Sequence, residues 1–570
     1  MLVDSDLGLS VPPERLTLGA FMEDIAARFA DNEAMVLGDR RVSYRQLAEE
    51  SRAVAKALLA AGVPKGAKVG LLVGNRPEFV SGAFGAAMVG AVVIPVSTFA
   101  TAPERHHIMR HSDMTLLVVE DHMGSHRYLE ELETDHPELV AGPAGRIRSV
   151  AFPFLRRLVT LDAERPGVET WDDFLAAGQD IGDDLLGAAA AEVLPYDDAM
   201  IIYTSGTTAE PKAVLHTQRS VTAMLWRWGK QMELDPTDRV WSVFPFFWTA
   251  GFAMVLAGTL AAGASLVLQE GFDAGEALAL MERERVTAVH TFPHTEAQLV
   301  DHPDARRRDL SALTKVRPSS PLGQLVGAKT APDAWDLRSG YGASETFTIS
   351  TALPADAPLD LRLASHGLPL PGMRIRIVDT ETGEPLAPGE SGEITVKGVT
   401  LMRTYYKVAP EKALDDEGWY HSGDAGHLDD QGYLHWHGRI SGLIKTGGSN
   451  VSPVEVETRA SEVEGVGVVS VIGVPHPMLG EAVVMCVVPL RDVELDLDAL
   501  GRHLRATLAT YKVPRRVLLF EDGELSFTSS DKVVFDELRQ LAARRLVETD
   551  DDADWVACLE AYLKEASHQP

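Results

Sequence analysis

A short stretch rich in glycine, serine and threonine follows the apolar run Ala199–Ile202 and contains a single lysine. It reads YTSGTTAEPKAV over Tyr203–Val214. After a strand, such a loop offers backbone N–H groups and hydroxyls that converge on one point, and Lys212 adds a mobile cation. These groups suit phosphate. The stretch is not a Walker A loop, because the chain has no G-x-x-x-x-G-K-[ST], and taken alone it also fits an ordinary polar surface loop.

Two groups of histidines invite a comparison with zinc sites. They are His421, His427, His435 and His437 in one group, and His106, His107 and His111 in the other. No cysteine or carboxylate completes a tetrahedral set with them in the sequence pattern, so we expect no metal there. Alternate strand residues such as His435 and His437 more often share one solvated face of a sheet. A serine-hydrolase elbow, G-x-S-x-G, is absent as well.

Charge and cysteine content narrow the classes further. The chain has 53 Lys and Arg against 83 Asp and Glu, a formal charge of −30. A field of that sign repels nucleic acid and anionic membrane. The two cysteines, Cys486 and Cys558, form no redox or metal motif, and the start MLVDSDLGLSVPPERL lacks the pattern of a signal peptide. We therefore expect a cytoplasmic protein.

One uncharged segment, Phe79–Phe99, is about long enough to cross a bilayer. Its first half is rich in glycine and alanine, which is typical of a packed helix, and GAVVIPV then indicates a turn and a buried strand. We favour this reading over a membrane span and expect no integral membrane segment.

The length of 570 residues predicts two or more domains. From Leu16 to about Val326, helical patterns alternate with short apolar runs, which indicates layered α/β subdomains with a mostly parallel sheet. From Leu368, short alternating strands separated by Gly and Pro predict an antiparallel, β-barrel-like piece. After Arg439 the pattern is that of a small α+β domain, so we place a boundary near Gly442. The predicted domains are residues 1–441 and 442–570, the second with a helical tail after an acidic run at 548–554.

Four stretches occur in an order and spacing that resemble the adenylate-forming superfamily of acyl-CoA synthetases, peptide-synthetase adenylation domains and firefly luciferases. They are YTSGTTAEPKAV, GYGASE, WYHSGDAGHLDDQGYLHWHGR and GLIKTGGSNVSPVEVE. The resemblance covers roughly residues 16–540. It implies a large N-terminal adenylation domain, a small mobile C-terminal domain, and the use of ATP, Mg²⁺ and coenzyme A.

The resemblance also implies a nucleotide site. The first stretch would cradle the β- and γ-phosphates, and Thr204 with Glu345 would hold Mg²⁺, for which a carboxylate is a suitable hard ligand. Tyr341 would stack on adenine, Asp424 would accept both ribose hydroxyls, and Arg439 would support the same nucleotide. Outside this context, these are ordinary loop, capping and ion-pair residues. The implied nucleotide-binding set is Thr204, Ser205, Gly206, Thr207, Thr208, Lys212, Tyr341, Gly342, Ser344, Glu345, Asp424, Arg439 and Lys532.

The implied catalytic residues are Thr204, Glu345 and Lys532, the last in LSFTSSDKVVFDELR. This segment matches the family imperfectly, because Ser526 and Phe527 replace the usual proline and basic residue and Asp531 replaces the usual glycine. A solvated lysine at a helix start is the alternative for Lys532.

Three glycines have implied roles in the second half-reaction. Gly447 and Gly448 would line the path of the CoA pantetheine, and Gly442 aligns with the pivot about which relatives turn their C-terminal domain. Glycine suits a hinge because it adopts widely separated φ/ψ pairs at little cost, although an ordinary turn glycine would look the same.

The acid-binding pocket is expected to be apolar. The segments FPFFWTAGFAM, HTFPHT and QLVGAK supply many aromatic and aliphatic side chains and no obvious cation for a polar acid. Trp248 stands where many relatives carry a histidine, and a core aromatic is its plainer reading. We expect a hydrophobic monocarboxylate, medium-chain, cyclic or aryl. The predicted pocket residues are Phe247, Trp248, Gly251, His290 and Gly327.

The function that these patterns predict is an ATP-dependent carboxylate:CoA ligase that forms an acyl-AMP and then an acyl-CoA thioester. An acyl-AMP ligase or amide-bond-forming enzyme that uses no free CoA is the first alternative. A nucleotide-binding regulatory protein with a degenerate site is the second, motivated by the irregular lysine segment and by Ala209 and Ala213 where the phosphate loop usually has glycine. The expected partners are the small acid and CoA, with homodimer formation left open.

Overall fold

The computed structural model divides into two compact units, Met1–Ile375 with Val396–Tyr420 and Arg376–Thr395 with His421–Pro570. It describes residues 9, 13–124, 126–162, 164–204, 211–328, 340–353, 357–446, 449–491, 493, 495–508, 510–521, 523–525 and 535–566. Gly442 lies inside the second unit, and the division at 441/442 stays a prediction about movement.

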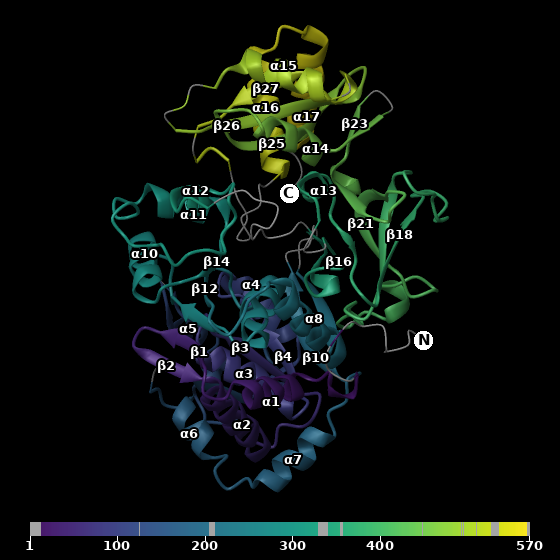
Figure 1. Ribbon diagram of the computed structural model, residues 1–570. Helices are drawn as coiled ribbons and strands as arrows, with labels where there is room; N and C mark the ends of the chain where they lie inside the picture. Colours follow the sequence, from purple (N-terminus) through teal and green to yellow (C-terminus); the bar gives the residue numbers. More distant parts are fainter. Residues whose placement is uncertain are drawn as a thin grey trace. The chain divides into compact units, whose positions relative to one another are not determined.

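The first unit contains an eight-stranded sheet in the order β20-β11-β10-β4-β3-β5-β8-β9. Figure 1 labels β3, β4 and β10 of this sheet. All pairings from β10 to β9 are parallel, whereas β10–β11 and β11–β20 are antiparallel. This confirms the predicted mostly parallel sheet. Its strands are β3 (Lys68–Leu72), β4 (Val92–Pro95), β5 (Met114–Val119), β8 (Arg157–Thr160), β9 (Glu169–Thr170), β10 (Asp198–Thr204), β11 (Lys212–Thr217) and β20 (Thr404–Tyr405).

A second sheet of the first unit has five strands in the order β14-β12-β13-β1-β2. The pairings from β14 to β1 are parallel and β2 is added antiparallel to β1. Its strands are β1 (Glu33–Leu37), β2 (Arg40–Ser43), β12 (Arg239–Ser242), β13 (Ser265–Leu268) and β14 (Ala288–His290), and a small separate hairpin joins β6 (His122–Met123) to β7 (His126–Arg127).

Helices of the first unit begin where the sequence supplies caps. Ser43 Oγ accepts from Gln46 N at 3.2 Å, and Gln46 Oε1 in turn accepts from Ser43 N at 2.8 Å, so a helix begins at Tyr44. The helices are α1 (Leu18–Phe29), α2 (Tyr44–Ala60), α3 (Pro77–Met88), α4 (Ala102–His111), α5 (Tyr128–Asp135), α6 (Trp171–Ala176), α7 (Asp183–Ala191), α8 (Gln218–Gln231), α9 (Gly258–Ala261), α10 (Ala274–Arg283), α11 (Pro293–Asp301), α12 (Pro321–Leu325) and α13 (Leu359–Ala364). A π-helical segment, Ala250–Ala257, precedes α9.

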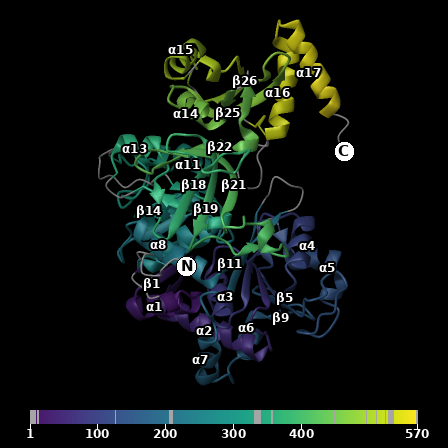
Figure 2. The same ribbon diagram turned by 90° about the vertical axis from the view of Figure 1, so that its right-hand side faces the viewer.

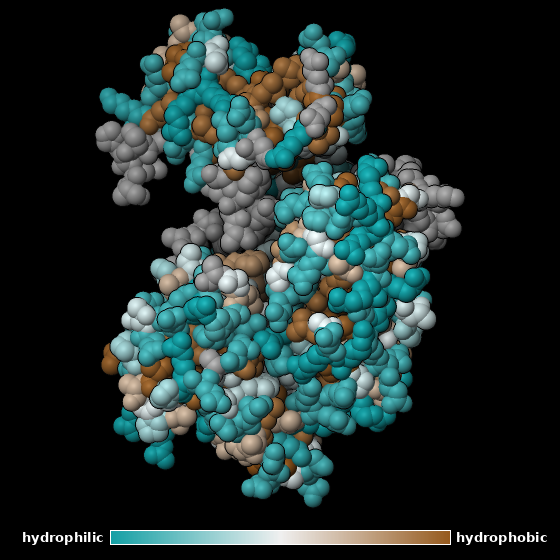
Figure 3. All heavy atoms as spheres, turned by 90° about the vertical axis from the view of Figure 1, so that its left-hand side faces the viewer, coloured by the Kyte–Doolittle hydropathy of each residue, from teal (hydrophilic) through white to brown (hydrophobic). Residues whose placement is uncertain are grey.

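The long uncharged segment folds as predicted, into α3, a turn and the buried strand β4. Within the described ranges, none of the helices combines the length and the hydropathy needed to cross a bilayer. Hydrophilic residues cover most of the face of the molecule seen in Figure 3.

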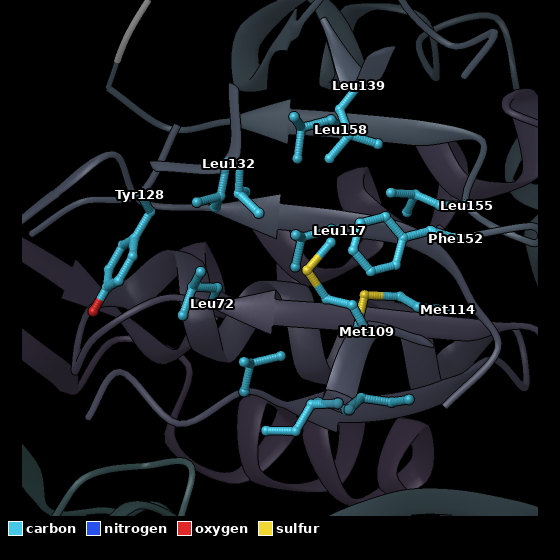
Figure 4. Packing of buried hydrophobic residues seen from close by; sticks show 14 of the residues in the cluster. Leu72, Met109, Met114, Leu117, Tyr128, Leu132, Leu139, Phe152, Leu155 and Leu158 are labelled. Atoms are coloured by element: carbon cyan, nitrogen blue, oxygen red, sulfur yellow. The ribbon is translucent and has the colours of Figure 1, made fainter. Parts of the chain in front are cut away.

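One core of the first unit lies on the face of the large sheet that α4 and α5 cover. Leu72, Leu117 and Leu158 from neighbouring strands meet Met109 of α4 and Tyr128 of α5 (Figure 4). All five side chains are at most 3% exposed, so α4 and α5 pack firmly against the sheet.

Short strands follow, as the sequence predicts. A three-stranded antiparallel sheet contains β15 (Gly340–Tyr341), β16 (Thr351–Ala352) and β17 (Leu368–Pro369). A four-stranded sheet has the order β18-β19-β21-β22, and its strands are β18 (Met373–Val378), β19 (Gly392–Gly398), β21 (Tyr420–Leu428) and β22 (Leu434–Arg439).

The C-terminal part of the second unit is the predicted α+β domain. Alternate residues of its central hairpin face opposite sides: Ile472 and Val484 pack with Trp555, whereas Val471 and Val483 pack with other helices. Helices α14 and α15 lie on one side of this sheet and α16 and α17 on the other (Figure 2). The elements are β23 (Ile444–Thr446), β24 (Ser449–Val451), α14 (Pro453–Ser461), β25 (Val466–His476), β26 (Gly480–Pro489), α15 (Leu497–Thr507), β27 (Arg516–Leu519), α16 (Phe535–Thr549) and α17 (Ala553–Ala566).

Candidate active site

The predicted phosphate loop joins two adjacent antiparallel strands. Thr204 is the last residue of β10 and Lys212 the first of β11, and the two are register partners. They therefore lie side by side at the two ends of the loop. Ser205, Gly206, Thr207 and Thr208 fall outside the described residues.

The GYGASE segment has a tightly constrained backbone. A Cβ on Gly342 would lie 2.2 Å from the carbonyl oxygen of Thr348, so no larger residue fits there. Phe347 and Thr348, which end the turn, have φ angles of 51° and 110°, in the region that favours glycine. The 3-10 turn Ser344–Thr346 directly precedes Phe347 and carries Ser344 and Glu345. Tyr341 is buried in this structure, with 6% of its surface exposed, and its predicted adenine contact stays a prediction.

His216, which the sequence reasoning missed, attaches this turn to the phosphate-loop hairpin. Its Nε2 lies 2.7 Å from the carbonyl oxygen of Ser344, and because a carbonyl accepts only, Nε2 carries the proton. The ring meets Phe347 edge-on at 4.9 Å. The residue is completely buried, and this burial lowers the pKa of His216 to about 4, so the ring is neutral at pH 7.

Tyr405 on β20, also missed, connects the predicted metal ligand with the loop lysine. Its hydroxyl donates to Oε1 of Glu345 at 2.7 Å, and Lys212 Nζ lies over its ring, 5.3 Å from the centroid. β20 pairs with β11, which sets Tyr405 beside Val214. A cation and a carboxylate are thus held by one phenol beside the phosphate loop. No local pattern in MRTYYK signals this role, because the strand pairing that creates it spans far-separated segments.

The residues around Glu345 fit a Mg²⁺ ion. Proteins hold Mg²⁺ through one or two carboxylates together with substrate phosphates rather than through a full protein cage. Within the described residues, no group of three or more His, Cys, Asp or Glu is arranged to hold a metal. Burial and the charge of Glu345 raise the pKa of Tyr420, which therefore stays a neutral phenol beside the carboxylate. Thr204 as a second ligand stays a prediction.

In the second unit, the structure brings Asp424 and Arg439 together. They are register partners on β21 and β22, and Arg439 Nε lies 3.0 Å from Oδ1 of Asp424. Arg439 also donates to the carbonyl oxygen of Ser422 at 2.7 Å, while Ser422 Oγ accepts from Asp424 N at 3.0 Å. Asp424 is 5% exposed, so its carboxylate is held in one orientation, as a two-oxygen acceptor for a diol requires.

The hinge candidate Gly442 ends a 3-10 turn, Ile440–Gly442, and is exposed. A Cβ there would make an ordinary contact with Arg439 Cβ at 3.5 Å, so neither strain nor crowding requires glycine in this conformation. Gly447, Gly448 and Lys532 lie outside the described residues, and their roles stay predictions.

The histidines of β21 and β22 contact one another. Nδ1 of His427 lies 3.1 Å from Nε2 of His437, and His427 stacks on His435 with ring centroids 4.5 Å apart. Nε2 of His435 lies 3.1 Å from Oδ2 of Asp429. Burial, and next the neighbouring His427, lower the pKa of His437 to about 4, so the His437 ring is neutral at pH 7.

Four of the five predicted acid-pocket residues fall in one region of the first unit. Phe247 and Trp248 meet edge-on at 5.9 Å, and Trp248 meets Phe292 at the same distance. Phe292 packs on Phe244, which lies 6.4 Å from His290. Burial lowers the pKa of His290 to about 4, so it adds no positive charge at pH 7.

The two glycines predicted for this pocket differ. A Cβ on Gly251 would lie 1.8 Å from the carbonyl oxygen of Pro245, so glycine is required for the π-helical segment to pass this close to Pro245. Gly327 has a φ of 70° in the turn after α12 and is exposed with open space around it. Its place in an acid pocket stays a prediction.

A layered α/β unit with this loop, joined to a small α+β domain, defines an adenylate-forming fold. Family comparison agrees: residues 22–406 match "AMP-binding enzyme" and residues 455–532 match "AMP-binding enzyme C-terminal domain". The chain belongs to the AMP-binding enzyme family. The predicted family and enzyme class, the AMP-forming acyl-CoA synthetases, are thereby confirmed.

Two curated relatives and two solved structures show the extent of the likeness. A 3-[(3aS,4S,7aS)-7a-methyl-1,5-dioxo-octahydro-1H-inden-4-yl]propanoyl:CoA ligase of Rhodococcus jostii is 31% identical, over 92% of this chain and 98% of that protein. An indoleacetate–CoA ligase of Aromatoleum aromaticum is 31% identical, over 89% and 94%. The anthranilate CoA ligase AuaEII with anthranoyl-AMP superposes with a TM-score of 0.77 over 94% and 99% at 24% identity, which bears on the fold alone. The amide bond synthetase McbA of Marinactinospora thermotolerans gives 0.73 over 92% and 99% at 26% identity.

Proposed function

We propose that the protein is an ATP-dependent ligase that activates a hydrophobic carboxylic acid as its acyl-AMP and then transfers the acyl group to the thiol of coenzyme A. The observation that carries the first step is the arrangement of Lys212, Tyr405 and Glu345 beside the loop between β10 and β11. It provides a cation for phosphate oxygens and a fixed carboxylate for a metal at adjacent points.

The chemistry needs no protein nucleophile. A carboxylate oxygen of the acid attacks the α-phosphorus of ATP, the bond to the β-phosphate oxygen breaks, and pyrophosphate leaves. The chain's own residues would position the reactants and neutralise charge. Lys212 would meet the phosphates, Glu345 is oriented by Tyr405, and Asp424, oriented by Arg439, would accept the ribose hydroxyls. Bound Mg²⁺ would neutralise phosphate charge. The thiolate of CoA then attacks the acyl carbonyl and AMP leaves.

The acid is proposed to be cyclic or aryl rather than small and polar. The described rings around Trp248 are apolar, and His290, which lies beside Phe244, is neutral at pH 7. Relatives that act on indoleacetate and on a fused-ring propanoate support this class.

An enzyme that couples the acyl-AMP to an amine is the second candidate, because the amide bond synthetase McbA shares the fold over almost the whole chain. A nucleotide-binding protein with a degenerate site remains the third, motivated by the irregular segment around Lys532.

One experiment separates the three. The purified chain is incubated with ATP, Mg²⁺, CoA and a panel of acids, and pyrophosphate release and loss of free thiol are measured together. With a ring-containing acid, we expect the amount of pyrophosphate released to equal the amount of free thiol lost. Pyrophosphate and hydroxylamine-trapped acid without thiol loss would favour the amide-forming enzyme. No pyrophosphate with any acid would favour the regulatory protein. Acetate or a polar amino acid as the best substrate would contradict the proposed acid class.

A further inference from the structure

Phe99, in the loop between β4 and α4, extends the aromatic cluster around Trp248. Its ring meets Phe247 with centroids 5.2 Å apart and an angle of 86°, and Trp248 at 6.2 Å and 78°. Both are edge-to-face contacts, the geometry that aromatic rings favour. We call the row Phe99, Phe247, Trp248, Phe292 and Phe244 the aromatic wall.

Phe99 differs from its neighbours in the wall by its exposure. Half of its surface is accessible (50%), whereas Phe247 is 5% exposed. A molecule that reaches the wall from solvent therefore has the face or free edge of Phe99 available, while the ring of Phe247 is already covered. Single exposed phenylalanines are common and do not by themselves indicate a binding site. At Phe99, hydrogen bonds to the neighbouring backbone give a second reason to expect one.

The backbone on both sides of Phe99 is fixed from the protein interior. Tyr128 Oη donates to the carbonyl oxygen of Thr98 at 2.7 Å, and Arg105 NH1 donates to that of Ala100 at 2.6 Å. Both donors are at most 3% exposed. In Figure 4 the hydroxyl of Tyr128 points away from the other labelled core side chains, toward a partner outside that cluster.

Two buried side chains thus hold the peptide groups before and after a half-exposed ring. Phe99 N also donates to Ser97 Oγ at 3.2 Å, which tightens the same loop. A ring presented on a fixed backbone loses little conformational entropy when a ligand covers it, so it is pre-organised for contact. Such a ring also has a defined direction, which allows it to discriminate between ligand shapes.

We propose that Phe99 is a specificity-determining residue that contacts the distal ring of the acid and selects flat, ring-containing acids over flexible chains. This inference rests on the proposed function and names its substrate class more closely. A flat ring can stack on or meet Phe99 edge-on, which adds to the gain from buried area, whereas an aliphatic chain of equal carbon number gains the area term only.

The test compares two acids with the same number of carbon atoms, 3-phenylpropanoate and nonanoate. The measured quantity is the ratio of their kcat/KM values in pyrophosphate release, for the wild type and for Phe99→Leu and Phe99→Tyr. Phe154→Leu is the matched control, because Phe154 is equally exposed (53%) but lies on the loop before β8. Thermal melting and the KM for ATP monitor folding and the nucleotide site.

We expect the wild type to prefer 3-phenylpropanoate and the preference to fall about three- to tenfold in Phe99→Leu, the range expected for one lost aromatic contact. Phe99→Tyr and Phe154→Leu should keep the wild-type ratio, and the KM for ATP should not change. Equal losses with both acids in Phe99→Leu would reduce Phe99 to a structural role and overturn the proposal, as would an unchanged ratio or a wild-type preference for nonanoate. Failure of the proposed function is separate, since it would appear as no pyrophosphate release by the wild type with any acid of the panel.

Discussion

The hydroxyl of Tyr405 donates a hydrogen bond of 2.7 Å to Oε1 of Glu345. The two residues are 60 positions apart, and no sequence pattern indicates that they are in contact. Lys212 lies over the ring of the same tyrosine, so one phenol contacts both a carboxylate and a cation. In the proposed ligase, this arrangement would serve the first half-reaction, the formation of the acyl-AMP.

Tyr405→Phe removes that hydrogen bond and keeps the ring under Lys212. Because hydrogen bonds to charged groups contribute about 1.5–3 kcal/mol, we expect kcat/KM for pyrophosphate release to fall about tenfold or more, and half-saturation to require more Mg²⁺. Tyr406→Phe is the matched control, since Tyr406 donates to Asp113 Oδ2 at 2.8 Å instead. Equal effects of the two substitutions on the Mg²⁺ dependence would argue against a positioning role for Tyr405.

Trp248→Ala should broaden acceptance toward larger acids. The indole meets Phe99, Phe247 and Phe292, so its removal opens space within the aromatic wall. We expect discrimination between acids of different shape to fall more than the rate of the reaction. A panel of acids of increasing ring size, ranked by kcat/KM, measures the change. An unchanged ranking in a folded variant would make Trp248 a core residue only.

Lys532→Ala and Gly442→Pro should damage opposite half-reactions. Loss of the lysine is expected to slow adenylation by a few kcal/mol, about 10²–10³-fold, while supplied acyl-AMP is still converted to acyl-CoA. Proline at the hinge candidate fixes φ. If this traps the C-terminal domain in the orientation that it takes for adenylation, pyrophosphate release should persist and thioester formation should fail. Gly442→Ala is the control, because a Cβ at this position makes only an ordinary contact here. Equal loss of both half-reactions in each variant, with folding intact, would contradict the hypothesis that the C-terminal domain takes a different orientation for each half-reaction.

Acid should destabilise the first unit through His216. Burial lowers its pKa from the ordinary 6.5 to about 4, so the unfolded chain binds a proton more readily than the folded one between these values. The stabilisation is therefore complete above pH 6.5 and is lost as the pH falls toward 4, by about 1–3 kcal/mol for this group. His216→Gln keeps an amide donor for the Ser344 carbonyl and should flatten this part of the stability curve. Chemical denaturation at pH 4.5, 5.5 and 7 measures it, and parallel curves for both proteins would refute the assignment.

Local sequence patterns are sufficient to predict many of the elements of this protein and its family. The alternation of helical and apolar patterns predicts the layered α/β unit, and the uncharged Phe79–Phe99 divides into α3 and β4 as its glycines and its proline indicate. The four ordered motifs identify the family, because each is a contiguous stretch that can be recognised without knowing what it contacts in space.

Only the tertiary structure shows which side chains contact one another at the candidate site. His216 reaches Ser344, Tyr405 reaches Glu345, and Phe99 reaches Trp248 only because strand order and helix packing bring separate segments together. Periodicity reports which face of an element is buried but not what it is buried against, so these contacts have no signal in the sequence. The same reason explains why a tyrosine in MRTYYK and a phenylalanine in STFAT, plain in the sequence, become candidates to orient the metal ligand and to select the acid.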